Sequence, residues 1–400
     1  MKKRETANPY VTVLLSCLVI FVYGMLSSLL GTIIPGLAAA LHLTNSQIGY
    51  VALAQGLGLA ATSVVAGALM DKQGKKIGVI LGLGATLAGL ILLGSSKGVI
   101  AVAAAMFVLG CGGSLVIVAA NAIVSDVGDE KRAAALNFLN VFSGLGGLAT
   151  PFIAANLLGS NSSRIVVFGI ATTVLVLCLA LLVPLSKRPV ASEERASDQR
   201  NLFSNPALYL LSAVTLLYTA CEFGIWNWLP KFLIASGMST AVALNVLSLG
   251  FACGLLCGRI VATSVLWRIS PSIVVIVSSL LMAGTTYMIL QREPVWLTSV
   301  LVFLAGAAMA PVFPTTIAIV ARLFKEQSAT AIGFAITCGF SGLILSSPLI
   351  GWLSGSDPLG VGRGLLIVPV LSMIIFAILI LSRKLFSQGT RENLPNLDVS

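Results

Sequence analysis

One glutamate stands apart from the other acidic residues because it lies inside a long apolar stretch. Glu222 falls within segment 207–233, and no other acid is placed so deep in an apolar segment. An ionised carboxylate at the centre of a membrane helix costs at least about 2.5 kcal/mol, so an acid there is a candidate for function. We expect Glu222 to exchange H⁺, bind Na⁺ or accept hydrogen bonds from the hydroxyls of a solute. The alternative is a structural, protonated acid.

Trp226 lies one helical turn beyond Glu222 and therefore on the same face of the predicted helix. An aromatic plane beside a carboxylate suits a sugar, whose C–H faces are apolar and whose hydroxyls need acceptors. The alternative is the aromatic belt that membrane proteins place at the lipid–water interface. For Trp228 we expect the belt, and for Trp226 both interpretations stay open.

Several amide side chains also fall inside apolar stretches. Asn137 and Asn140 are three residues apart in one predicted helix, so they share a face, which Gly144 continues. Amides in a helix bundle often hydrogen-bond a neighbouring helix, for about 0.6 kcal/mol each. We expect at least one amide of the set to contact a solute. The set is Gln55, Asn121, Asn137, Asn140 and Asn227.

Patterns typical of enzymes are missing from the sequence. We find no nucleotide-binding glycine loop, metal-ligand cluster or hydrolytic triad. Cys253 and Cys257 stand four apart on one predicted helix, but no other soft ligand lies nearby, so close packing explains them better than a metal. One lone glutamate is not a cluster of reactive groups at one depth. We therefore expect no enzyme, no cofactor and no ATP-driven step.

The composition explains how these residues are positioned. Of the 400 residues, 57% are hydrophobic and only 10% are charged, whereas a soluble domain carries about 25% charged residues. The net charge of +10 does not indicate a nucleic-acid partner, because the Lys and Arg residues punctuate apolar runs instead of clustering. The sequence therefore predicts an all-α membrane protein with the lipid bilayer as its surroundings.

Twelve apolar segments are long enough to span a membrane, for which about 20 residues suffice. The first apolar run continues from residue 10 to about 41, far beyond the roughly 7–15 residues of a signal-peptide core, so we expect a retained helix. The predicted spans are 11–40, 47–70, 77–95, 99–125, 133–158, 164–185, 207–233, 240–266, 271–290, 295–321, 329–354 and 363–383.

The basic residues alternate between the two sides of these spans. With twelve spans, 19 of the 24 Lys and Arg residues fall on the side of the termini and 5 on the other. Cytoplasmic loops carry the excess of Lys and Arg. We therefore expect a multi-pass protein of the inner (plasma) membrane with both termini in the cytoplasm.

The chain also divides into two similar parts. Residues 107–138 align with 303–334 without a gap, at a shift of 196. The expected domains are a six-helix bundle at 1–185, a polar cytoplasmic linker at 186–205, a second six-helix bundle at 206–385 and a cytoplasmic tail at 386–400. Parallel repeats of this kind place a solute site between the halves near the bilayer midplane.

A charged turn follows the second span. It reads Gly67-Ala-Leu-Met-Asp71-Lys-Gln-Gly74-Lys-Lys, and it resembles the signature loop of the major facilitator superfamily. The resemblance implies twelve helices in two bundles related by a pseudo-twofold axis, and transport by alternating access. It also implies gating roles for Asp71 and Arg132, for Gly67 through close helix packing, and for Gly74 through a tight turn.

The second half carries only Gly254-Leu-Leu-Cys-Gly258-Arg259, which we interpret as a remnant of that loop. Ala262 stands where the aspartate would fall. We expect Arg259 to belong to a weaker gate on that side.

Four short stretches are similar to the fucose–galactose–glucose symporter group of the superfamily. Two departures stand out: the acids of the fucose permease group on helices 1 and 4 are here Gly31 and Ile117. These departures put proton coupling by the familiar route in doubt. The stretches are Ala119-Ala-Asn121, Ala135-Leu-Asn137-Phe138, Tyr218–Trp226 and Ala310–Thr315.

These observations together predict a secondary carrier for a small neutral solute such as a monosaccharide, by symport with H⁺ or Na⁺ through Glu222 or by facilitated transport. The alternative is a carrier, for uptake or efflux, of another small metabolite or an organic anion. An anion site would need a cation in the cavity, and the sequence places no Lys or Arg deep in a span. By the habit of the family we expect a monomer.

Overall fold

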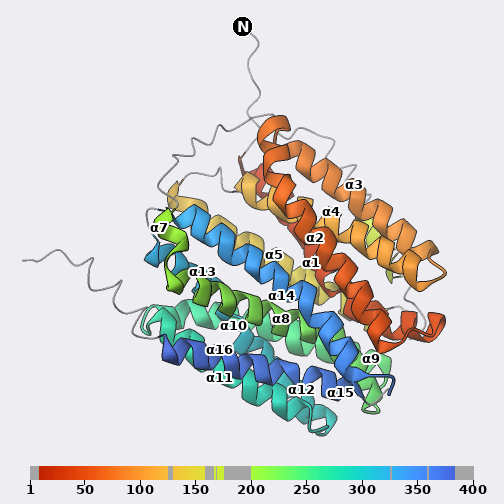
Figure 1. Cartoon of the computed structure of the whole chain (residues 1–400). Helices are drawn as coiled ribbons and strands as arrows, with labels where there is room; N and C mark the ends of the chain where they lie inside the picture. Colours follow the sequence, from red (N-terminus) through yellow and green to blue (C-terminus); the bar gives the residue numbers. More distant parts are fainter. Residues whose placement is uncertain are drawn as a thin grey trace, which may run out of the picture.

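The computed structural model describes residues 9–124, 129–157, 166–167, 169–174, 200–324, 327–357 and 360–382. Within these ranges the regular structure is helical throughout (Figure 1). The helices are α1 (Pro9–Leu41), α2 (Asn45–Gln73), α3 (Lys75–Ser95), α4 (Val99–Val124), α5 (Asp129–Asn156), α7 (Arg200–Phe203), α8 (Pro206–Ala235), α9 (Thr240–Asn245), η1 (Val246–Ala252), α10 (Cys253–Leu266), α11 (Pro271–Ile289), α12 (Val295–Met309), α13 (Val312–Leu323), α14 (Ser328–Ser354), α15 (Val361–Leu365) and α16 (Ile367–Leu381).

These helices confirm the predicted fold class. Ten helices of the described chain are long and apolar enough to span a membrane. Every predicted span coincides with helix except 164–185, where only residues 166–167 and 169–174 are described, and these are helical. In the predicted linker, residues 200–203 form the short helix α7. Residues 186–199 and the predicted tail lie outside the described ranges.

Three of the predicted spans are interrupted. The span at 240–266 is formed by α9, the π-helical segment η1 and α10 in direct succession. The span at 295–321 breaks between α12 and α13 at Pro311, because proline has no N–H to continue the helical hydrogen bonds. The third, the span at 363–383, is divided at Leu366 between α15 and α16, so all three interruptions lie in the C-terminal half of the chain.

The helices form two groups that meet at α5, α8 and α14. Helices α2, α3 and α4 pack together on one side, and α11, α12 and α16 on the other (Figure 1). Contacts of α1 with α8, of α2 with α14 and of α5 with η1 join the groups. We call residues 9–174 the N-terminal half and residues 200–382 the C-terminal half.

Close glycine contacts repeat between the halves. A Cβ added to Gly58 of α2 would collide with the carbonyl oxygen of Phe107 on α4, and a Cβ on Gly254 would collide with that of Phe303 on α12. Gly254 follows Gly58 by 196 residues, and Phe303 follows Phe107 by the same number, which is the shift that the sequence predicted. Gly254 is therefore the counterpart of Gly58, and the interpretation of 254–259 as a remnant of the loop at 67–76 is wrong.

The same repeat relates α1 to α8 with a shift of 195. A side chain at Gly146 would collide with the carbonyl of Phe21, and one at Gly342 with the carbonyl of Leu216. Gly24 approaches the carbonyl of Ser143, and at the equivalent place the Thr219 hydroxyl donates to the carbonyl of Gly339. On this register Tyr218 corresponds to Tyr23, and Glu222 corresponds to Ser27.

The halves meet at one end of the molecule, which we call the closed end. Asn45 at the start of α2 bonds to Lys231 near the end of α8, and Asn156 at the end of α5 bonds to Asn245 of α9. Further towards the middle, the backbone of α2 at Gly49 and Gly56 meets Pro348 and Ile344 of α14, respectively.

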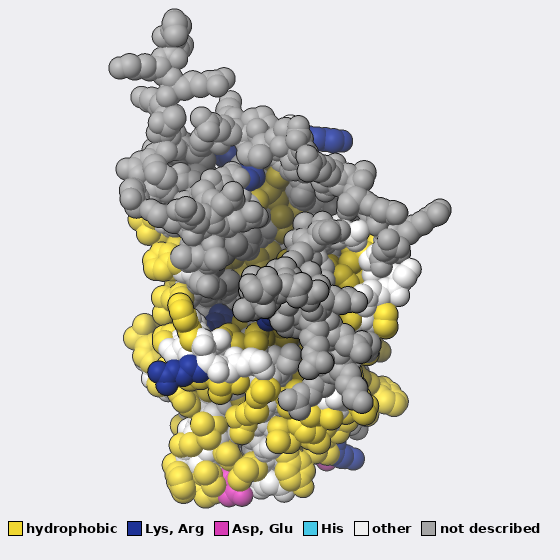
Figure 2. All heavy atoms as spheres, turned by 90° about the vertical axis from the view of Figure 1, so that its left-hand side faces the viewer, with side chains coloured by type: hydrophobic (Ala, Val, Ile, Leu, Met, Phe, Trp, Pro, Cys, Tyr) yellow, Lys and Arg dark blue, Asp and Glu magenta, His cyan; other side chains and the backbone are white. Residues whose placement is uncertain are grey.

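The other end, where α2 gives way to α3 and α8 begins, we call the open end. Among the described residues, no hydrogen bond joins the halves there. A Cβ added to Gly67 on α2 or to Gly333 on α14 would meet no atom within 4 Å. Figure 2 views the molecule from the side on which α7 lies in Figure 1, and lysine and arginine side chains appear there among hydrophobic ones.

Candidate functional site

Glu222 lies at the middle of α8, half-buried and facing the other half of the molecule. Its carboxylate is close enough to act electrostatically on the phenols of Tyr218, one turn earlier on α8, and Tyr23 on α1. No ion pair of Glu222 is found in the part of the chain that the structure describes. The carboxylate therefore lies halfway along α8, within reach of tyrosines from both halves and without an ion-pair partner among the described residues.

Tyr218 connects Glu222 to other polar and aromatic groups. The ring of Tyr218 is 1% exposed and lies 6.1 Å, between ring centroids, from Phe313 of α13. Besides Glu222, the guanidinium of Arg259 on α10 acts electrostatically on Tyr218. Tyr218 is therefore under the electrostatic influence of both a carboxylate and a guanidinium.

Tyr23 and Ser27 form the corresponding pair in the N-terminal half. The Ser27 hydroxyl donates to the carbonyl oxygen of Tyr23 at 3.0 Å, and the Tyr23 ring would lie 3.6 Å from a Cβ on Gly113 of α4. Sequence analysis missed both tyrosines. The signal was available, because Tyr218 lies one turn before Glu222 and the repeat maps that pair onto Tyr23 and Ser27.

Trp226 belongs to the packed contact between the halves. It is 6% exposed, its ring lies edge-on to Phe251 at 5.1 Å, and its outer ring edge would lie 3.4 Å from a Cβ on Gly147 of α5. Its carbonyl oxygen leaves no room for a side chain at Gly31 of α1. Protein therefore surrounds Trp226 on several sides, and only glycine fits the close approach at Gly31.

The predicted place of Trp228 in the interfacial aromatic belt is wrong. Its side chain is 0% exposed, and its indole nitrogen has no hydrogen-bond partner among the described residues. A Cβ on Gly351 of α14 would lie 3.3 Å from its ring. Trp228 therefore packs between α8 and α14 instead of facing an interface with lipid.

Two of the predicted amides make structural hydrogen bonds. Asn227 is 2% exposed and donates to the hydroxyl of Ser347 on α14 at 3.0 Å. Asn121 lies in the last turn of α4 and donates to the carbonyl of Ile117 at 2.7 Å. The next carbonyl, that of Ala122, accepts from Lys75 at 2.7 Å. Asn121 therefore lies at the open end, away from the depth of Glu222.

The remaining amides are spread over two helices. Gln55 of α2 is half-buried, and its backbone carbonyl oxygen faces Gly110 of α4. Asn140 of α5 is exposed. The Asn137 side chain lies outside the described part, although α5 passes through its position.

The predicted gate residues have mixed outcomes. Gly74 has φ +89°, a backbone conformation that suits glycine, and it separates α2 from α3 as predicted. Among the described residues, no atom lies within 4 Å of a Cβ added to Gly67, so its role in close packing stays a prediction. Arg259 is half-buried on α10. The side chains of Asp71 and Arg132 lie outside the described part.

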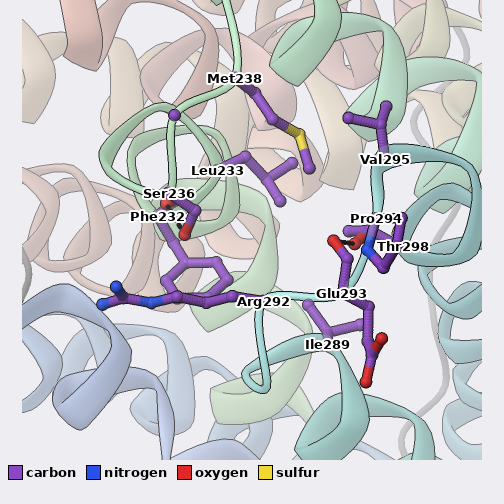
Figure 3. A pocket seen from close by; sticks show the side chains of 11 residues that line it. Phe232, Leu233, Ser236, Met238, Ile289, Arg292, Glu293, Pro294, Val295 and Thr298 are labelled. Carbon is purple, nitrogen blue, oxygen red and sulfur yellow. Dashed lines mark hydrogen bonds between the residues drawn. The ribbon is translucent and has the colours of Figure 1, made fainter.

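A separate hollow lies at the closed end, within the C-terminal half. Its volume is about 160 Å³, and it is formed where α8 ends and α11 connects to α12 (Figure 3). Phe232, Arg292 and Glu293 are among its lining residues. Because every lining residue comes from one half, this hollow does not coincide with the position of Glu222 between the halves. No cluster of three His, Cys, Asp or Glu suited to a metal occurs among the described residues.

Comparisons with known proteins agree with this architecture. A family model described as the Major Facilitator Superfamily matches residues 16–289. The uncharacterised MFS-type transporter YceJ of Bacillus subtilis (strain 168) is 20% identical over 348 residues, which are 84% of this chain and 87% of that protein.

Two solved structures show the same fold at low identity. The xylose transporter XylE from E. coli, in an inward open conformation, superposes with a TM-score of 0.76 at 12% identity, over 94% of this chain and 96% of that one. The transporter FucP, in an outward conformation, superposes with a TM-score of 0.64 at 19% identity, over 94% and 99%. Since the family model spans more than half of the sequence, the chain belongs to the Major Facilitator Superfamily, whose members are membrane transporters and not enzymes.

Proposed function

We propose that this transporter carries a small neutral polyhydroxylated solute, such as a monosaccharide, by alternating access, and that the solute binds between the halves beside Glu222. One observation carries the proposal: a carboxylate without a charged partner among the described residues faces phenols from both halves at mid-membrane depth. Parallel repeats place solute sites at this depth between the halves.

The chemistry of the surrounding groups favours hydroxyls as ligands. Glu222 accepts hydrogen bonds, Tyr23 and Tyr218 both donate and accept them, and Phe313 supplies an apolar face beside Tyr218. A sugar ring offers hydroxyls at its edge and C–H groups on its faces, which matches such a set. FucP, described as a fucose:proton symporter, and XylE, a xylose transporter, share the fold. We place the chain with the fucose–galactose–glucose group on the four sequence stretches.

Coupling of transport to an ion follows from the same carboxylate. A charge at this depth is expensive unless it is paired or neutralised. We propose that Glu222 takes up H⁺ or Na⁺ as the solute binds, which makes the carrier a symporter. Of the predicted binding residues, Gln55, Asn137 and Asn140 stay candidates. Asn121 lies towards the open end, and Trp226 and Asn227 support the helices around the site.

A specific observation favours a second candidate, a small organic anion. The sequence placed Arg259 at a gate, but the structure brings its guanidinium within electrostatic reach of Tyr218. An anionic solute would find a cation there.

We propose that the closed end faces the outside of the cell and the open end the cytoplasm, in the inner membrane with both termini cytoplasmic. The excess of Lys and Arg on the side of the termini supports this orientation. The higher TM-score with the inward open structure, 0.76 against 0.64, arises despite the lower identity of 12% against 19%. This ranking supports an inward-facing conformation. We place Asp71 and Arg132 as gate residues at the open end.

The assembly follows the family. We propose a monomer of two six-helix bundles, at 1–185 and 206–385, joined by the linker 186–205. Each bundle then moves as a unit around the site at Glu222.

Uptake of radiolabelled solutes into proteoliposomes tests the proposal. The panel contains monosaccharides and organic anions, each with and without an imposed proton or sodium gradient. We expect gradient-driven accumulation of a monosaccharide, which Glu222→Gln abolishes while downhill exchange is retained. Glu293→Gln, at the α11–α12 connection, is the matched control and should transport normally. Accumulation of anions alone would establish the second candidate, and no sugar transport by folded protein would exclude the first.

A further inference from the structure

A buried amide at the closed end joins the halves through three contacts. Asn45, the first residue of α2, is 4% exposed. Its side-chain oxygen accepts from the Lys231 ammonium of α8 at 2.6 Å. Its side-chain nitrogen donates to the carbonyl oxygens of Gly355 at 2.9 Å and Asp357 at 3.4 Å. Asn45, a residue of the N-terminal half, thus binds both the end of α8 and the segment after α14.

The backbone around Asn45 is fixed from both sides. Thr44 caps α2 in a capping box with Gln47, which holds the start of the helix. A Cβ added to Gly351 of α14 would lie 2.5 Å from the backbone carbonyl oxygen of Asn45. A residue larger than glycine would therefore not fit at position 351. The amide is therefore delivered to its partners by rigid structure and not by a mobile loop.

Lys231 depends on this amide for its hydrogen bond. The ammonium group lies 6.0 Å from the centre of the Trp228 ring, and among the described residues it has no carboxylate partner. The nearby Asp357 carboxylate instead pairs with Arg363 at 3.3 Å, on the surface. A half-buried ammonium that loses its acceptor is costly, because a buried donor without a partner keeps its full desolvation penalty.

We propose that Asn45 and Lys231 form a latch that holds the closed end shut and sets how often it opens. Alternating access requires the halves to separate at this end, which would break all three contacts of Asn45 together. The latch thus favours the conformation described here over the one in which the closed end opens. The inference goes beyond the proposed function, because it requires alternating access but no particular solute.

A second contact on the opposite flank provides an internal comparison. Asn156 of α5 and Asn245 of α9 exchange two amide hydrogen bonds, at 2.7 and 3.2 Å. Asn156 is exposed, so water can replace its partner. Loss of this pair should matter less than loss of the buried latch.

Accessibility of a cysteine at the closed end tests the latch without any solute. Ala52 of α2 is 1% exposed and lies between Gly49 and Gly56, which contact α14. In full-length protein whose native cysteines are replaced, Ala52→Cys is placed as a reporter in proteoliposomes. A membrane-impermeant maleimide is added to the side of the closed end, and the labelling rate follows the opening of that end.

We expect Asn45→Ala and Lys231→Met each to raise the labelling rate on the order of ten-fold, which corresponds to about 1.4 kcal/mol. The labelling rate of the double variant should not exceed that of the faster single variant, because both substitutions remove the same Asn45–Lys231 hydrogen bond. Asn156→Ala should raise the rate by about two-fold. Arg363→Met, which removes an exposed ion pair within one half, should leave the rate unchanged.

The latch is rejected if folded Lys231→Met labels at the parental rate, or if Arg363→Met raises the rate as much. Multiplicative effects in the double variant would also reject it, because they would show independent roles for the two side chains. Lys231→Met keeps the aliphatic stem, so it decides the matter even if Asn45→Ala does not fold. None of these outcomes bears on which solute the protein carries.

Discussion

In the N-terminal half, Gly58 lets α2 meet α4 at the carbonyl of Phe107, and in the C-terminal half Gly254 lets α10 meet α12 at the carbonyl of Phe303. The polar side chains do not repeat in the same way. Where α8 has Glu222, α1 has Ser27 at the equivalent position. The repeat therefore preserves the places where helices touch, while the polar side chains have diverged, and the acid Glu222 lies in the C-terminal half.

Removal of the hydroxyl from the two equivalent tyrosines, Tyr218 and Tyr23, should affect solute binding unequally. Tyr218→Phe removes a buried hydroxyl beside a carboxylate, and a hydrogen bond to a charged group contributes about 1.5–3 kcal/mol. We expect solute affinity to fall by at least ten-fold in equilibrium binding to purified protein. Tyr23→Phe, in the other half, should cost about two- to ten-fold. A larger loss at Tyr23 than at Tyr218 would contradict a site centred on the C-terminal half.

The close glycine contacts should respond alike to substitution in the two halves. Gly58→Ala and Gly254→Ala each force a Cβ into a carbonyl oxygen, and overpacking costs about 1–3 kcal/mol. We expect both variants to lower thermal stability in detergent by similar amounts. Matched controls are Gly84→Ala and Gly284→Ala, one in each half, where an added Cβ meets no atom within 4 Å. If one of the two tight positions tolerates alanine, the halves do not pack alike.

A third prediction concerns a glycine whose counterpart has a side chain. At the shift of 196, Gly67 corresponds to Thr263, whose hydroxyl donates to the carbonyl of Arg259. Gly67→Ala adds a Cβ in open space, so it should stabilise this conformation by about 0.5–1 kcal/mol through helix propensity. If the open end must close during transport, the same change should slow turnover. Thermal melting and transport rate, measured together, separate the two effects. Unchanged turnover would remove Gly67 from the gate.

Much of the fold could be predicted from the sequence because membrane helices need long apolar runs, and these are plain in one dimension. The repeat shift of 196 was also visible, since it left residues such as Phe107 and Phe303 in register. The breaks at η1 and at Pro311 were not predicted, because apolar composition continues through them.

Residues of the candidate site could be predicted only where their type is unusual for their position in the sequence. Glu222 stood out because a charge in an apolar run is rare, and Gly74 because a turn needed it. Trp228 was mistaken for a belt residue, because its aromatic type fits both a lipid interface and a protein interior and only packing against α14 distinguishes them. Tyr23 and Tyr218 do not stand out by residue type, since a tyrosine in an apolar run looks like any other aromatic residue. Only the one-turn spacing to Glu222 and the repeat point to them.

The smallest expected effect separates a structural amide from a solute contact. Asn227 donates to Ser347 in the C-terminal half, whereas in the N-terminal half the corresponding positions are Thr32 and Pro151, which cannot form that bond. Asn227→Ala should therefore lower stability by about 0.6 kcal/mol, the usual worth of such a bond in a bundle. Solute KM should stay unchanged, because Ser347 occupies the amide and both side chains are buried. Asn140→Ala, at an exposed position of α5, is the variant for comparison. It should keep the stability of the protein, and its solute KM rises if Asn140 contacts the solute. A raised KM in Asn227→Ala with stability intact would return Asn227 to the binding site and make the C-terminal half richer in solute contacts than its hydrogen bonds indicate.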